Sequence, residues 1–204
     1  MEIVRLKTRD GVHIVADYYD QGDTAVILLH QNGKDRHSWT SLIPELMDGG
    51  YSVLALDFRG HGESDLEFDA LTDKDYFAMR YDLEAAELFL KGKKIIVIGA
   101  SIGANAVLTS KNSIAGVLLS PGLNYRSLNA EKDILTYKHP LLIIASQEDG
   151  DSYISAKKLQ ESHKNAMLKT YSGMGHGTMM FTKSPDLPET ILEWLDITLK
   201  RKKV

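Results

Sequence analysis

A serine flanked by two glycines follows an apolar run near the middle of the chain. Residues 94–98 read Lys-Ile-Ile-Val-Ile, and residues 99–103 read Gly-Ala-Ser-Ile-Gly, a G-x-S-x-G pattern. On a sharp turn between a strand and a helix, such a serine exposes its hydroxyl, and the next backbone N–H can face an oxyanion. The placement predicts Ser101 as a nucleophile, although small residues at such a turn can also serve close packing alone.

A histidine surrounded by glycines lies far downstream of this serine. His176 follows residues 166–171, and glycines at 173, 175 and 177 let the backbone bend toward Ser101. An imidazole so placed takes the serine proton as general base and returns it to the leaving group as general acid. The glycines do not form a dinucleotide-binding G-x-G-x-x-G pattern, because Thr178 occupies its last position. His176 is therefore the predicted base.

An acidic cluster lies between the serine and the histidine, just beyond the apolar run 141–145. Asp149 is the carboxylate that we expect to hold His176 in its working tautomer, because it lies in the loop beyond this run. Asp151 is an alternative, since a one-residue shift in the path of the loop would exchange the two, and Glu148 is a third. A non-catalytic interpretation makes the cluster a solvated turn in which Asp151 or Ser152 caps the next helix.

Strands and helices alternate along the chain in a way that brings these groups together. Alternating polarity predicts a hairpin over 3–7 and 12–18, and nearly continuous apolar runs predict strands covered on both faces. The other expected strands are 25–29, 53–56, 95–98, 117–119, 141–145 and 166–171, and the expected helices are 39–47, 76–90, 102–110, 154–163 and 187–199. This order indicates an α/β fold: a mostly parallel sheet of about eight strands with helices on both faces. The carboxyl ends of parallel strands share one edge, where we expect the three groups to meet.

Two further motifs give the chain a family resemblance. Residues 28–33 read Leu-Leu-His-Gln-Asn-Gly and are followed by Trp39, and residues 57–64 form a D-x-R-G-x-G-x-S pattern. With the nucleophile turn, and the order serine, acid, histidine, they make the chain resemble the α/β-hydrolases over nearly its whole length. The resemblance implies two backbone oxyanion donors, Ile102 and either Asn32 or Gln31. The family most often has glycine where Gln31 stands.

Many α/β-hydrolases insert a helical cap after the strand that we expect at 117–119. Here only residues 121–139 separate it from the next strand, which is too short for a lid domain. We therefore expect an open site, with Leu123, Tyr125 and Leu135 as candidate walls of the pocket. Three residues near the histidine fill the core or, alternatively, form an apolar wall for acyl chains: Met174, Met179 and Met180.

The other histidines are expected to have structural or surface roles. His163 lies among polar residues of an expected helix, which favours a surface position. His30 is expected to brace the turn that follows the 25–29 strand, and His61 to order the 57–64 loop. The histidines lack paired ligand spacing, so we expect no metal site, and without a cofactor motif we expect no cofactor.

Composition bounds the class of protein. The 204 residues, 43% hydrophobic and 25% charged, predict a single domain over residues 1–204. A net charge of −4 indicates no nucleic-acid partner, and the basic run 200–203 is expected to end the last helix favourably against its dipole. The absence of cysteine excludes a disulfide or a cysteine nucleophile. No run approaches the ~20 apolar residues of a membrane span, so we expect no membrane partner and a cytoplasmic location.

Together these features predict a serine hydrolase of a small carboxylic ester or thioester. The expected partner is therefore a small-molecule ester or acyl substrate, cleaved through an acyl-enzyme. Two other functions on the same fold stay open: a non-catalytic protein that binds a small ligand, and an acyltransferase. The oligomeric state does not follow from the sequence.

Overall fold

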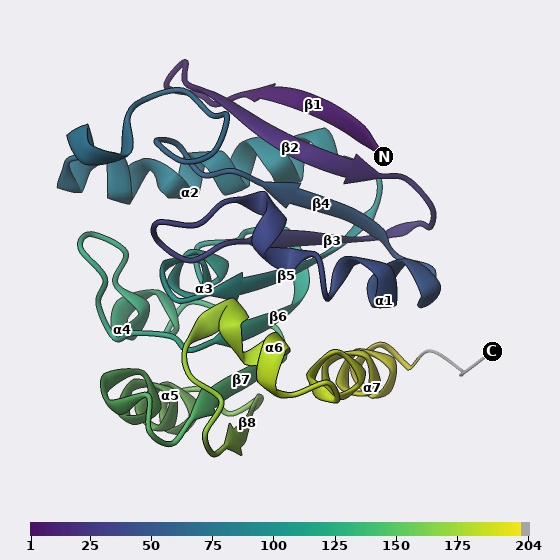
Figure 1. Cartoon of the computed structure of the whole chain (residues 1–204), viewed down its shortest axis with the longest axis vertical. Helices are drawn as coiled ribbons and strands as arrows, with labels where there is room; N and C mark the ends of the chain where they lie inside the picture. Colours follow the sequence, from purple (N-terminus) through teal and green to yellow (C-terminus); the bar gives the residue numbers. More distant parts are fainter. Residues whose placement is uncertain (201–204) are drawn as a thin grey trace.

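The structure is a computed structural model that describes residues 1–200, and one eight-stranded sheet forms its centre (Figure 1). The order across the sheet is β1-β2-β4-β3-β5-β6-β7-β8. The strands are β1 (Glu2–Lys7), β2 (His13–Tyr19), β3 (Thr24–Leu29), β4 (Ser52–Leu56), β5 (Lys94–Ala100), β6 (Ser113–Leu119), β7 (Leu141–Ser146) and β8 (Ala166–Tyr171). Strands β3 to β8 run parallel, whereas β2 pairs antiparallel with both β1 and β4. The predicted sheet with its N-terminal hairpin is confirmed.

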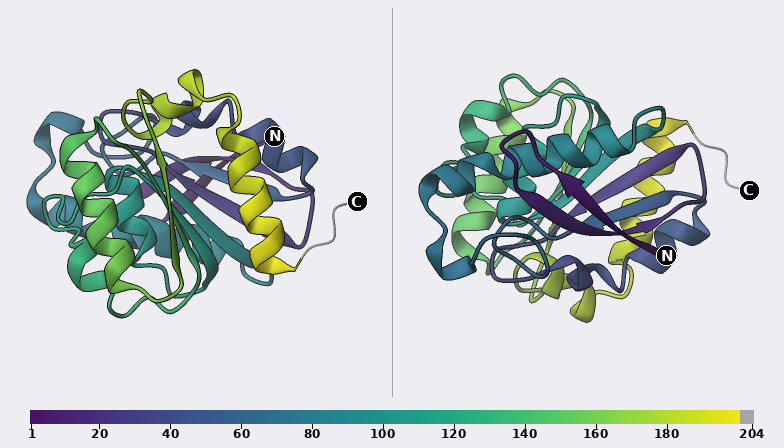
Figure 2. Two further views of the ribbon diagram at one scale, coloured as in Figure 1. Left: turned by 90° about the horizontal axis from the view of Figure 1, so that it is seen from below. Right: turned by 90° about the horizontal axis from the view of Figure 1, so that it is seen from above.

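Helices cover both faces of the sheet (Figure 2). The helices are α1 (Ile43–Asp48), α2 (Asp73–Phe89), α3 (Ile102–Val107), α4 (Ala130–Asp133), α5 (Gly150–Ser162), α6 (Met180–Lys183) and α7 (Leu187–Leu199), with 3-10 turns η1 (Arg36–Trp39), η2 (Phe68–Ala70) and η3 (Gly177–Met179). One apolar core joins the sheet to α2, α3, α4 and α5, and the other joins it to α1, α6 and α7. Burial on both faces explains why the central strands are continuous apolar runs.

The prediction of one helix over residues 39–47 is wrong. The chain instead forms η1, ending at Trp39, and a separate helix α1 that begins at Ile43. Pro44 is the physical reason, because proline has no N–H to donate and fits only the first turn of a helix. Helix α2 begins three residues earlier than expected, because Thr72 and Asp75 form a capping box at its start.

The 57–64 motif builds a buried turn at the end of β4. The Asp57 carboxylate accepts a hydrogen bond from the Arg36 backbone N–H at 2.7 Å and pairs with the Arg36 guanidinium. The Ser64 hydroxyl donates to the Asp57 carbonyl at 2.8 Å. Arg59 is tied to α2 by its ion pair with the fully buried Asp82, at 2.7 Å. The hydrogen bonds and ion pairs of this motif therefore have a structural role.

Between β6 and β7 the described chain has only the short helix α4, so no cap domain covers the carboxyl edge of the sheet there. Within residues 1–200, no helix has both the length and the apolar character needed to cross a bilayer. Lys200 ends α7 in the left-handed conformation, with φ +53°. The rest of the basic run, which was expected to act on the helix dipole, lies outside the described residues.

Candidate active site

Ser101 occupies the turn between β5 and α3 with an unusual backbone. Its φ is +54° and its ψ is −114°, a region that a residue with a side chain rarely adopts. The flanking glycines permit this turn: a Cβ at Gly99 would lie 2.2 Å from the Gly103 carbonyl oxygen, and one at Gly103 would lie 2.2 Å from that of Leu29. Strain of this kind is concentrated at functional positions. The turn leaves Ser101 partly exposed at the carboxyl edge of the sheet.

His176 contacts Asp149 directly. Its Nδ1 lies 2.7 Å from the Asp149 Oδ2, and the side chains are 37% and 18% exposed, respectively. An ionised Asp149 accepts the hydrogen bond, so Nδ1 carries the proton and Nε2 is left free to accept one. The Ser152 hydroxyl lies 3.5 Å from the same Nδ1, a contact that the sequence analysis did not anticipate.

The three acidic candidates have different surroundings. Asp149 is the N-cap residue of α5, yet its carboxylate makes no capping hydrogen bond; it turns to His176 instead. Glu148 accepts hydrogen bonds from the Ser146 hydroxyl and from the Gly175 backbone N–H, the latter at 3.1 Å. Asp151, in the first turn of α5, makes no contact with the imidazole. Neither Asp151 nor Ser152 caps the helix through its side chain.

The loop that carries His176 is fixed at both ends. Before the histidine, the Met174 N–H donates to the Ser146 hydroxyl at 3.0 Å, and the Gly175 N–H donates to Glu148. After it, the Gly177 N–H donates to the Ser120 hydroxyl at 2.9 Å. Ser146 is the last residue of β7 and Ser120 directly follows the neighbouring strand β6, so the sheet itself positions the imidazole. A serine at the carboxyl end of a buried strand is the sequence signal that could have identified both.

Gln31 connects this loop to the turn after β3. Its side-chain oxygen accepts hydrogen bonds from the Thr178 backbone N–H at 2.8 Å and from the Thr178 hydroxyl at 3.2 Å. Gly177 has a φ of +58°, and a Cβ there would lie 2.1 Å from the same oxygen, so a larger residue would be strained and would displace the Gln31 side chain. Where the α/β-hydrolases that the sequence resembles most often have glycine, Gln31 thus has a side chain that ties the candidate oxyanion turn to the histidine loop.

His30 braces the turn from inside, as expected. It is fully buried, its Nδ1 lies 2.8 Å from the Gln31 carbonyl, and its Nε2 accepts from the Phe58 N–H at 3.0 Å. Burial lowers the pKa of His30 to about 3, so the ring is neutral at ordinary pH. Burial also lowers the pKa of His61, whose Nδ1 lies 3.0 Å from the Arg59 carbonyl in the 57–64 turn.

Ser101 and His176 line one open cleft of about 700 Å³. The lining residues are Gln31, Asn32, Ser101, Ser120, Gly122, Leu123, Asn124, Tyr125, Asp151, Ser152, Ile154, Ser155 and His176. Both candidate oxyanion residues, Gln31 and Asn32, belong to it. Ile102 begins α3, where a backbone N–H has no acceptor one turn earlier in the helix. The edge of the sheet thus places the nucleophile turn, the imidazole and the turn after β3 around one space.

Several expected side chains lie elsewhere. Leu123 and Tyr125 line the cleft, but Leu135 is 72% exposed and does not, so that prediction is wrong. The apolar wall of methionines is wrong too, because Met180 is buried in the core and neither it nor Met174 nor Met179 lines the cleft.

The surface position predicted for His163 is also wrong. The residue is buried, and its Nε2 lies 3.0 Å from the Tyr137 carbonyl. Helix α5 ends at Ser162, so His163 leaves the helical spacing and turns inward. The polar residues beside it in the sequence therefore gave a false signal.

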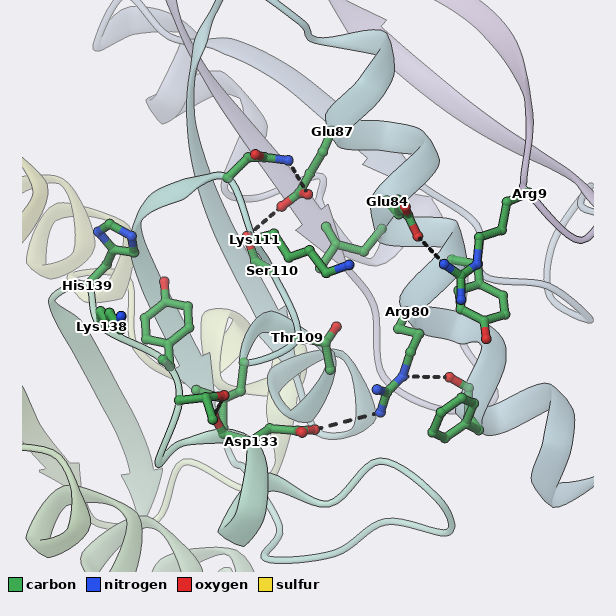
Figure 3. A pocket seen from close by; sticks show the side chains of 17 residues that line it. Arg9, Arg80, Glu84, Glu87, Thr109, Ser110, Lys111, Asp133, Lys138 and His139 are labelled. Atoms are coloured by element: carbon green, nitrogen blue, oxygen red, sulfur yellow. Dashed lines mark hydrogen bonds and ion pairs between the residues drawn. The ribbon is translucent and has the colours of Figure 1, made fainter.

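A second cavity, of about 530 Å³, lies away from this edge (Figure 3). It lies between α2 and the segments that lead into β6 and β7, at the amino ends of these strands. Ion pairs bridge its walls, Arg80 to Asp133 at 3.8 Å and Arg9 to Glu84 at 3.6 Å. Neither Ser101 nor His176 takes part. No group of three or more His, Cys, Asp or Glu residues within residues 1–200 is arranged to hold a metal ion.

Glu148 gives the histidine loop a predictable acid sensitivity. Its hydrogen bonds, first from Ser146 and then from the backbone of Gly173 and Gly175, lower its pKa to about 2. A carboxylate with a lowered pKa stabilises the fold fully above its unfolded pKa, and this contribution is lost as the pH falls toward the folded pKa. The free energies of unfolding of the native protein and Glu148→Gln should therefore differ at pH 6 and converge between pH 4.5 and 2. Urea titrations across this range measure it; a constant difference would contradict the assignment.

Comparisons with known proteins agree with this fold. Residues 24–110 match the family model of the alpha/beta hydrolase fold. Epoxide hydrolase A of Mycobacterium tuberculosis is 32% identical over 118 residues, which are 55% of this chain and 36% of that protein. The chain thus spans about a third of the length of this curated relative.

Two solved structures show the same fold over nearly the whole chain. An esterase of Pyrococcus furiosus superposes with a TM-score of 0.79 at 23% identity, covering 97% of this chain and 90% of the esterase. Est1E of Butyrivibrio proteoclasticus, solved with ferulic acid bound, gives 0.82 at 18% identity, covering 97% and 100%. The family-model match and these two likenesses show that the chain has the α/β-hydrolase fold.

Proposed function

We propose that the protein is a serine hydrolase that cleaves small carboxylic esters or thioesters through an acyl-enzyme. The observation that carries the proposal is the cleft itself. Ser101, on its strained turn, and His176, held by Asp149, both line it. A pocket that only binds a ligand does not need this set. The esterases among the structural neighbours support the same reaction class.

In this reaction the Ser101 hydroxyl attacks the carbonyl carbon of the substrate while Nε2 of His176 takes the hydroxyl proton. The π electrons of the carbonyl bond move to the carbonyl oxygen. The Ile102 N–H and an N–H of Asn32 or Gln31 stabilise the resulting oxyanion. The intermediate collapses, and the leaving alcohol departs with the proton from His176. Water then attacks the acyl-enzyme by the same steps in turn, which releases the acid and restores the serine.

The open cleft favours esters over amides. An alkoxide or thiolate leaves more readily than an amide nitrogen, so an ester requires less activation of its leaving group. No cap domain between β6 and β7 encloses the cleft, so water reaches the acyl-enzyme directly. Small esters and thioesters are therefore the substrates to test first.

Intact-mass analysis after treatment with a phosphonofluoridate tests the nucleophile without knowledge of the substrate. The native protein should gain one adduct, and the variant Ser101→Ala should gain none. Ser155→Ala is a matched control, because Ser155 also lines the cleft but belongs to helix α5, where its hydroxyl donates to the Asp151 carbonyl; this variant should still be labelled.

Absence of the adduct on folded native protein would overturn the proposal in favour of a ligand-binding protein. An acyltransferase would also be labelled, so hydrolysis needs its own measurement. Product analysis with an added alcohol separates the two: free acid as the main product supports a hydrolase, and transfer of the acyl group to the alcohol would contradict it.

A further inference from the structure

The walls of the catalytic cleft have an uneven charge. Asp151 contributes a carboxylate to the lining, and the Asp149 carboxylate contacts His176, which also lines the cleft. No lysine or arginine occurs among the residues of the described chain that line this cleft. A charged molecule that enters therefore meets a negative field without a compensating cation.

Asp151 is not neutralised by its surroundings. Its side chain forms no hydrogen bond or ion pair with another residue among those that the structure describes, and it is exposed in the first turn of α5. Only its backbone carbonyl is engaged, with the Ser155 hydroxyl at 2.6 Å.

Four cations come near the cleft without lining it: Lys34, Arg126, Lys157 and Lys183, whose Nζ would lie 3.8 Å from a Cβ at Gly175. Two of them are directed elsewhere. Arg126, next to Tyr125 of the lining, forms an ion pair with Asp73 at 3.6 Å and lies 4.8 Å from the centre of the Tyr76 ring. Lys157 of α5 lies over the Tyr153 ring, 5.2 Å from its centre. Neither side chain lines the cleft, so neither balances Asp151 there.

We infer that the cleft selects its substrates by charge, with Asp151 as the residue that determines this specificity. Esters that carry an ammonium group are preferred over neutral esters of the same shape, and esters that carry a carboxylate are disfavoured. The inference rests on the proposed ester hydrolysis and names the substrate class within it. The Asp151 carboxylate, at the wall of the cleft and partly screened by water, should raise kcat/KM for the ammonium ester about threefold to tenfold over that for the neutral ester.

The test uses pairs of esters that differ only in charge. 4-Nitrophenyl 4-(trimethylammonio)butanoate and 4-nitrophenyl 5,5-dimethylhexanoate place nitrogen or carbon at the same position of the acyl half. 2-(Trimethylammonio)ethyl butanoate and 3,3-dimethylbutyl butanoate do the same in the alcohol half. We expect the charged member to have the higher kcat/KM in at least one pair. The gain should lie in KM, because a charge remote from the reacting carbon stabilises substrate and transition state alike.

Two changes should remove this preference. In Asp151→Asn the ratio of kcat/KM values should fall to about one, whereas Glu161→Gln, which removes an exposed carboxylate from the far end of α5, should leave the ratio as in the native protein. Raising the salt from 0.1 M to 1 M, which shortens the screening length from about 10 Å to about 3 Å, should also lower the ratio.

The outcomes separate this inference from the proposed function. If the native protein hydrolyses the neutral esters but shows no preference in either pair, or a preference that survives Asp151→Asn, the charge selection is overturned and the hydrolase stands. If it hydrolyses none of the four esters and takes no phosphonofluoridate label, the proposed function itself fails.

Discussion

The variant Asp149→Asn is expected to lose about 10³- to 10⁴-fold in kcat on any ester that the native protein cleaves. Asparagine fits the same space, but its NH₂ group donates where the carboxylate accepts. His176 Nδ1 would then become the acceptor, and the proton would move to Nε2, the atom that must receive the serine proton. The corresponding exchange in a serine protease triad costs about 10⁴ in kcat. The 2.7 Å contact between Asp149 and His176 predicts the same penalty here.

Single-turnover and steady-state kinetics on one 4-nitrophenyl ester measure this effect. Far-ultraviolet circular dichroism and the melting temperature verify that the variant is folded. The residual activity of Asp149→Asn is also informative. The proposed backbone donors act without the base, so some catalysis should remain. A loss of this size in Asp151→Asn and not in Asp149→Asn would contradict the assignment of the acid.

The second large effect is on stability. Gly103→Ala should destabilise the protein by about 3 kcal/mol or more, because the new Cβ would lie 2.2 Å from the Leu29 carbonyl oxygen and 2.8 Å from that of His30. Both neighbours are backbone atoms at the end of β3, so no side chain can rotate away. Relief requires α3 to move from the sheet, which displaces Ser101 and the turn after Leu29 together.

Gly150→Ala is the matched control for this prediction. Gly150 begins α5, and a Cβ there meets nothing within 4 Å. Its effect should stay within about 0.5 kcal/mol. Urea denaturation of the two variants beside the native protein measures the difference, and equal stability of Gly103→Ala and the native protein would show that the close approach of α3 to β3 is wrong.

The sequence was informative where a feature depends on neighbouring residues. Apolar runs and alternation predicted all eight strands, since a strand's polarity pattern records which of its faces are covered. The glycines at 99 and 103 marked the nucleophile turn, because a Cβ at Gly99 would clash with α3 and a Cβ at Gly103 would clash with the end of β3. Helix ends were less well predicted. Because of Pro44 and the Thr72 capping box, α1 and α2 each begin several residues away from the predicted start.

The sequence was uninformative where a feature depends on partners that are distant in the chain. Three carboxylates within four positions were equivalent in the sequence, and only the path of the loop brings Asp149 rather than Asp151 or Glu148 to the imidazole. His163 turned inward to a carbonyl 26 residues away. The sequence showed only that Gln31 stands where glycine is usual. Its partner, Thr178, could not be identified from the residues around Gln31 or from those around Thr178.

That Gln31–Thr178 bridge has a consequence for the order of assembly. It joins residues 147 positions apart, so closing it requires the chain to have collapsed around nearly all of the sheet. The nucleophile turn, by contrast, depends on contacts between β3, β5 and α3, all within residues 24–107. During refolding, a cleft competent for chemistry should therefore appear only after β7 and β8 have docked. Enzymatic activity then reports completion of the last folding step, whereas helical content reports an earlier one.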